Sequence, residues 1–183
     1  MTRRKMLAVL MMLGLGLWLS AMSAAADEKK ETKDSGDKEF ARKASASGLA
    51  EVNLSQLAVR FAQDPNVKQF AQRMVADHTR ANQELTQIAN QRSITLAKTM
   101  DEKHQKLYDK LKGMSGKEFD QTYMDALVKD HEAAVKLFEE ESKDGKDKAM
   151  KTWAGKLTPI FKKHLEKSRD LCKQTKGKKQ SKD

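Results

Sequence analysis

The sequence of 183 residues has little of what breaks helices or builds strands. It contains two prolines and nine glycines, and aromatic residues make up 5% of it. Alanine, leucine, lysine, glutamate, glutamine and methionine predominate, and these side chains lose little rotamer freedom in a helix. The composition predicts an all-α protein, and the length is sufficient for one domain with its own core.

Several chemical signatures are also missing. Cys172 is the one cysteine, so no disulfide can form within the chain. The sequence shows no nucleophile triad, no phosphate-binding loop and no dinucleotide fingerprint. These absences favour a non-enzymatic protein over an enzyme.

The first 26 residues have the three parts of a secretory signal peptide. Basic Arg3, Arg4 and Lys5 precede an apolar run over 6–19, and small residues end in Ala26. The run of 14 residues is short for a membrane span of about 20. We expect cleavage after Ala26, no transmembrane anchor afterwards, and a periplasmic or secreted protein. The n-region loosely resembles a twin-arginine signal, but the very hydrophobic run favours the Sec route.

The formal charge of +10 is unevenly distributed. Three basic residues leave with the predicted signal peptide, and the tail 173–183 holds five lysines against Asp183. A nucleic-acid-binding protein concentrates basic charge on a folded face, so nucleic acid is not an expected partner. The lysine-rich composition of the tail predicts a disordered end that makes at most a weak contact with anionic envelope components.

The rest of the chain divides into a leader and a helical domain. Residues 27–37 are charged and lack large apolar groups, which predicts a flexible leader. The domain 38–172 carries four long amphipathic segments. These long helices are expected over about 37–63, 65–91, 116–144 and 146–173, with a short helix over 101–112.

The connections predict how the helices are joined. The first pair and the last pair of long helices have short turns, whereas 92–115 forms a long link that carries the short helix. One long crossover in a four-helix bundle is the ferritin-like arrangement, and a plain up-down bundle is the alternative. Asp64 with Pro65 marks the start of the second helix, and Ser115 with Glu118 has the spacing of a capping box.

Four polar residues interrupt the apolar seams, one on each long helix. His78, His131 and His164 lie in the seams of the last three helices, and Glu51 lies in the stripe of the first. Counting residues from the helix ends places all four near one depth. Buried polar groups must be satisfied. They could form a structural hydrogen-bond network, which we favour, or bind one transition-metal ion such as zinc or iron.

Neighbouring residues refine this site. Asp77 and Asp130 each precede a seam histidine and point about 100° away from it, so we expect them to support ligands rather than to bind. A di-iron carboxylate site needs Glu-x-x-His on two helices. The residues three before the seam histidines are Val75, Val128 and Phe161, which excludes a di-iron centre.

Several motifs resemble one family. They are Gly48-Leu49-Ala50-Glu51-Val52, Val67-Lys68-Gln69-Phe70-Ala71, Met74-Val75-Ala76-Asp77-His78, Phe119-Asp120-Gln121-Thr122-Tyr123, Lys129-Asp130-His131, Leu157-Thr158-Pro159 and His164-Leu165. The chain resembles the bacterial domain-of-unknown-function 4142 family over about residues 38–172. The resemblance implies a ferritin-like bundle and an envelope location, and no activity.

Three hypotheses follow. The first is an exported ferritin-like envelope protein of unknown activity, a binding or structural and stress-related module with a polar His/Glu core. The second is a mononuclear metal-binding protein or oxidoreductase that uses Glu51, His78, His131 and His164. The third is an envelope-surface protein that acts through its basic tail.

Overall fold

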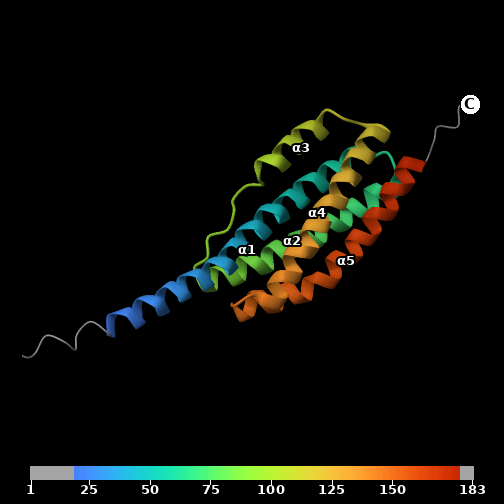
Figure 1. The fold of residues 1–183 in the computed structure, drawn as a ribbon. Helices are drawn as coiled ribbons and strands as arrows, with labels where there is room; N and C mark the ends of the chain where they lie inside the picture. The colour runs from blue at the N-terminus through green and yellow to red at the C-terminus, as the bar shows by residue number, and fades with distance from the viewer. Residues whose placement is uncertain (1–18, 178–183) are drawn as a thin grey trace, which may run out of the picture.

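The protein is a bundle of four long helices with one short helix outside it. The structure, a computed structural model, describes the backbone of residues 19–177 and the side chains of 36–177. Its elements are α1 (Leu19–Phe61), α2 (Pro65–Arg92), α3 (Glu102–Lys112), α4 (Gly116–Asp144) and α5 (Lys148–Gly177). The short α3 lies alongside α1 (Figure 1). The described residues form no strand, and the predicted all-α class is confirmed.

The long connection crosses the whole bundle. Near the start of α4, Asp120 accepts hydrogen bonds from the backbone nitrogens of Gln63 and Asp64, at the turn between α1 and α2. At the end of α2, Arg92 donates to Asp147, just before α5. The helices α2 and α4 therefore start at the same end and run parallel, so the link between them spans the length of the bundle. This is the predicted ferritin-like crossover.

Most helix ends lie close to where the sequence places them. Asp64 caps α2 by accepting from Asn66 N at 2.8 Å, with Pro65 in the first turn. Ser115 precedes α4 but makes no capping bond with its side chain. Gly116, at φ 63°, turns the backbone in the left-handed region at this start, so the capping-box geometry predicted for Ser115 does not form.

The helix α1 begins earlier than expected. Its backbone is helical from Leu19, so it runs through the segment 27–36 where we expected a flexible leader. That segment is rich in lysine and glutamate, which are good helix formers. Asp37 is buried and accepts from the backbone nitrogens of Lys146 and Asp147, so it is part of the folded domain.

The predicted export features are largely outside the described residues. Residues 1–18 and the end of the tail, 178–183, are not described. Cleavage after Ala26, the export route and the contact of the tail with anionic envelope components remain predictions. Among the described helices, none is long and apolar enough to cross a membrane.

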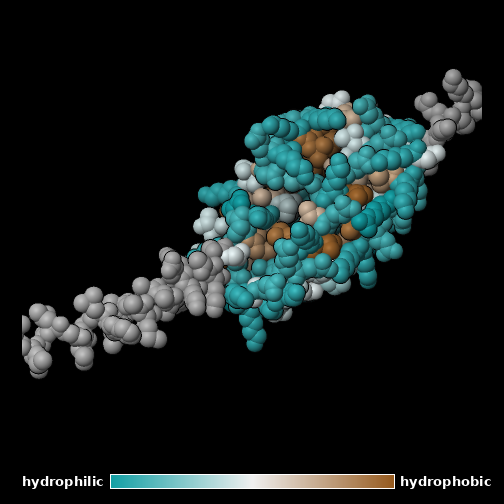
Figure 2. Space-filling model, in the orientation of Figure 1, coloured by the Kyte–Doolittle hydropathy of each residue, from teal (hydrophilic) through white to brown (hydrophobic). Residues whose placement is uncertain are grey.

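The core consists of two apolar clusters with a polar layer between them. One cluster includes Leu54, Met74, Leu127 and Leu171, and the other includes Ala44, Ala81, Phe138 and Phe161. On α2, α4 and α5 the sequence between these clusters holds one seam histidine, and on α1 Glu51 lies at the edge of the first cluster, next to Ala50. Figure 2 shows polar residues over most of the visible surface, with apolar residues between the helices. The fold therefore buries the polar layer inside the bundle.

Candidate metal centre

Three histidines from three helices meet in the polar layer. His78 comes from α2, His131 from α4 and His164 from α5, and all are at most 4% exposed. Their ring centroids lie 5.4 to 5.8 Å apart. Each ring offers one nitrogen, and these three atoms all lie within 4.8 Å of one another. The structure thus brings together the three histidines that the sequence placed in the seams.

Hydrogen bonds orient two of the three rings. Nδ1 of His131 lies 3.0 Å from the backbone oxygen of Leu127, one turn earlier on α4. Nε2 of His164 lies 3.1 Å from Oδ2 of Asp77. Because an oxygen acceptor requires a proton on the nitrogen that faces it, the opposite nitrogen of each neutral ring carries a lone pair.

The opposite nitrogens have no hydrogen-bond partner among the described residues. They are Nε2 of His131 and Nδ1 of His164, and Nε2 of His78 is also buried without a partner. A buried polar atom without a partner costs free energy, so natural structures rarely leave one alone. Each of the three neighbouring rings therefore has one buried nitrogen without a partner among the described residues.

The surroundings keep the rings uncharged. Burial lowers the pKa of His78 well below its usual value, and the neighbouring histidines lower it further. Burial also lowers the pKa of His131 to about 4. The pKa of His164 is lowered by burial although Asp77 acts in the opposite direction. Neutral imidazole is the form that binds a metal ion.

Glu51 lies behind one histidine rather than among the three nitrogens. Its Oε1 is 3.5 Å from Nδ1 of His131, the nitrogen next to the Leu127 carbonyl, and its Oε2 is buried without a partner. Burial raises the pKa of Glu51 well above its usual value, and the charge of Asp130 raises it further. The structure therefore places Glu51 beside His131 but outside the group of converging nitrogens.

The two aspartates of the predicted supporting shell have different surroundings. Asp77 contacts His164, as described, and Arg73 Nε lies 3.4 Å from the same carboxylate oxygen. Asp130 faces α3, where its Oδ1 lies 2.9 Å from Lys103 Nζ and 3.3 Å from His104 Nε2. Asp77 thus touches a seam histidine, whereas Asp130 fastens the short helix.

Two features of the site were not foreseen from the sequence. Phe161 stacks on His78, with centroids 5.1 Å apart and planes at 10°, and its ring also lies near the other two histidines. The backbone carbonyl of Leu127 orients His131. Because every residue has a backbone carbonyl, the identity of the residue at position 127 does not predict this contact. Only the spacing of Leu127 and His131, four residues apart on a helix, hints at that contact.

The residues fit a single metal ion. A metal bonded to three imidazoles at about 2.0–2.1 Å holds tetrahedral donors roughly 3.3 Å apart. Nitrogens within 4.8 Å of one another need only small side-chain movements to reach that spacing. Val75, Val128 and Phe161 occupy the positions where a di-iron site needs carboxylates, so a second metal lacks bridging ligands.

Comparisons with known proteins agree with the fold. A sequence model of the family described as "Domain of unknown function (DUF4142)" matches residues 20–171. No curated protein matches the chain. Among solved structures, the chain is similar to one described as "CopM in the Cu(II)-bound form", with a TM-score of 0.65 and 14% identity. The match covers 75% of this chain and 96% of that chain, and at this identity it shows a shared fold.

Proposed function

The chain belongs to the DUF4142 family, and we propose that it binds one transition-metal ion through His78, His131 and His164. The donor atoms are Nε2 of His78, Nε2 of His131 and Nδ1 of His164. One observation carries the proposal. Three buried histidines from three helices each bring one ring nitrogen within 4.8 Å of the others, and each of these rings has one nitrogen without a hydrogen-bond partner among the described residues.

The donor set favours copper(II), with zinc as its main competitor. Neutral imidazoles suit both metals, and copper(II) binds most nitrogen sites more tightly than zinc. The structurally similar CopM has been solved in a Cu(II)-bound form, which supports copper for a bundle of this shape. Iron, which the sequence also allowed, is less suited because no carboxylate joins the three nitrogens.

The function that we assign is metal binding, without a reaction. Three protein ligands leave one position of a four-coordinate metal open. The apolar side chains of Phe161 and Phe70 lie against the histidine rings, and no described acid or base lies among the three nitrogens. Asp77 and the Leu127 carbonyl hold the rings of His164 and His131 in the binding tautomer.

The chain offers a matched control for the test. His104 is buried like the other three, but it pairs with Asp101 and Asp130 at the α3–α4 contact. His131→Gln and His104→Gln therefore each remove one buried imidazole, and only the first removes a proposed ligand.

The experiment measures copper stoichiometry and ligand count. Protein is purified without an affinity tag from cells that express the full chain, stripped of metal and titrated with Cu(II). We expect one equivalent per chain, and an electron paramagnetic resonance spectrum with hyperfine structure from three nitrogens. His131→Gln and His78→Gln should lose tight binding while His104→Gln keeps it. Equal stoichiometry and affinity in all three variants would overturn the proposal.

A further inference from the structure

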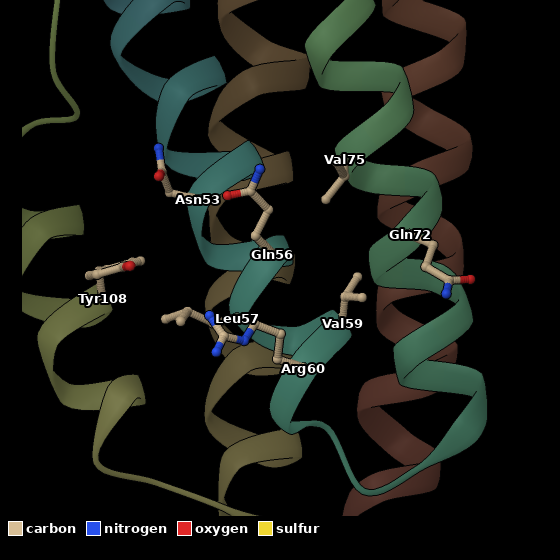
Figure 3. Close-up of a pocket in the computed structure, with 8 residues that line it drawn as sticks. All are labelled: Asn53, Gln56, Leu57, Val59, Arg60, Gln72, Val75 and Tyr108. Atoms are coloured by element: carbon tan, nitrogen blue, oxygen red, sulfur yellow. The ribbon is translucent and has the colours of Figure 1, made fainter.

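A hollow lies on the outside of the bundle, and none of the three clustered histidines lines it. It has a volume of about 430 Å³ and crosses the exposed face of α1 between α3 and α2. Figure 3 shows Tyr108 of α3 reaching toward Leu57 on one side of α1. On the other side Val59 and Val75 lie in the groove between α1 and α2. The size is in the range of natural small-molecule sites.

The walls of this hollow are mainly apolar, with the amide side chains of Asn53, Gln56 and Gln72 also lining it, and its charge has one sign. Leu57 is buried, and Val59, Val75 and Tyr108 are each half-buried. Arg60 is the charged residue among those that line it, and none of the described lining residues is acidic. An apolar hollow with one cation complements a ligand with an apolar body and one negative charge.

The cation is available to such a ligand. Arg60 forms no ion pair with any described residue, and its guanidinium lies 5.4 Å from the ring centroid of Phe61. A second cation stands at the same wall, since Lys112 Nζ lies 5.7 Å from the ring centroid of Tyr108. A carboxylate held beside Arg60 meets attraction from its guanidinium and repulsion from no lining acid.

We propose that this hollow binds an amphiphilic carboxylate with an aliphatic chain of medium length. The chain lies against Leu57, Val59, Val75 and Tyr108, and the carboxylate pairs with Arg60. Three of these four residues are aliphatic and only Tyr108 is aromatic, which favours an alkyl chain over an aromatic ring system. This site is independent of the proposed metal centre, because its lining residues include none of the three histidines.

The test compares two probes of equal chain length, one with a charged and one with a neutral head group. Decanoate and decanol are titrated, below the micelle concentration, into isotopically labelled protein purified from cells that express the full chain. We expect saturable 1:1 binding of decanoate, with methyl shifts centred on Leu57, Val59 and Val75. Decanol should bind about fivefold more weakly, since an exposed ion pair contributes up to about 1 kcal/mol.

Variants separate the charge from the cavity. Arg60→Gln should weaken the binding of decanoate about fivefold and leave the binding of decanol unchanged. Arg80→Gln, on an exposed part of α2 outside the hollow, should change the affinity for neither probe. Val75→Phe should weaken the binding of both probes because the larger side chain fills the hollow. If that variant does not fold, Val59→Phe tests the same point from the α1 side of the hollow. The proposal is overturned if decanoate does not saturate, if the filled variants bind like wild type, or if Arg60→Gln has no effect.

Discussion

At the scale of single residues, Asp77 determines how one histidine can act. Its carboxylate accepts from Nε2 of His164, which leaves Nδ1 as the nitrogen of that ring without a partner among the described residues. Carboxylates that hold a metal-binding histidine typically raise affinity 10- to 100-fold. Asp77 itself reaches the surface, so it can be replaced without leaving a buried charge alone.

We predict that Asp77→Ala lowers copper affinity by about 10- to 100-fold while one equivalent still binds. The reason is that His164 keeps its donor atom but loses the partner that fixes its tautomer. Competition titration against a chelator measures the affinity, and Asp170→Ala on the exposed face of α5 is the control. Unchanged affinity would show that the Asp77 contact does not orient the ring. The nitrogen hyperfine pattern should remain, which distinguishes this effect from the loss of a ligand.

Glu141 is a second residue whose surroundings have a measurable consequence. It is 7% exposed, its Oε1 has no hydrogen-bond partner among the described residues, and Gly145 packs closely on its carboxyl. Burial raises the pKa of Glu141 to about 7, and Asp37 and Asp147 add to the rise whereas Lys151 opposes it. The folded protein therefore holds the protonated acid more readily than the unfolded chain does.

The sign of the pH dependence follows from that difference. Because the pKa is higher in the folded state, Glu141 favours folding below its usual pKa of 4.5, and this contribution is lost as pH rises toward 7. We predict that Glu141→Gln melts a few degrees above wild type at pH 8 and close to it at pH 4.5. Glu140→Gln, its exposed neighbour, should follow wild type at both pH values. Thermal melts followed by circular dichroism provide the measurement, and an equal offset at the two pH values would contradict the explanation.

At the scale of elements, the helices were predictable because their signal is local. Apolar residues recur every three or four positions, and Pro65, Gly113 and Gly145 stand beside helix ends. The contacts that join the elements were not predictable, because they connect distant parts of the chain. Buried Asp120 of α4 holds the α1–α2 turn, and buried Asp37 of α1 holds the α4–α5 turn. Nothing in the local sequence distinguishes either aspartate from an aspartate on the surface.

The same limit applies to the candidate site. Periodicity selected His78, His131 and His164, because each interrupts an apolar seam. It also selected Glu51. A helical wheel gives the direction of a side chain around the helix and its depth along the bundle, but it does not show which nitrogen of a neighbouring histidine ring the carboxylate approaches. The tautomers depend on Asp77 and on a backbone carbonyl, and such contacts emerge only from the packed arrangement.

One element-scale contact yields a prediction of stability. Asp120→Ala removes the acceptor of two backbone N–H groups, at Gln63 and Asp64, in a part-buried turn. Each unsatisfied group costs about 1–3 kcal/mol, so we expect a loss of roughly 2–3 kcal/mol in the free energy of unfolding. Urea unfolding measures it. Glu140→Ala, which removes only a surface pair with Lys136, should change stability by less than about 0.5 kcal/mol. A loss for Asp120→Ala as small as that of the control would mean that solvent replaces the lost acceptor.

At the scale of the whole molecule, the bundle is two helix pairs packed through two apolar clusters, with a polar layer between the clusters. The turn-holding aspartates lie at opposite ends, since Asp120 is at the α1–α2 turn and Asp37 at the α4–α5 turn. The three histidines lie between the two apolar clusters, and they come from both pairs, α2 from one and α4 and α5 from the other. A ligand that binds all three therefore links the two halves of the fold.

This linkage predicts that metal stabilises the entire domain. The three nitrogens are held together only in the folded chain, so binding adds about 2.7 kcal/mol to stability when free copper is 100-fold above its dissociation constant. For a chain of this size the melting temperature should then rise by roughly 5–10 °C. His104→Gln should show the same rise, because its imidazole stands outside the group, whereas His131→Gln and His164→Gln should show almost none. Calorimetric scans with and without Cu(II) measure the shift. A rise that persists in the ligand variants would locate the stabilising metal elsewhere on the chain, whereas its loss in those two variants alone would connect the buried histidines to the stability of the whole bundle.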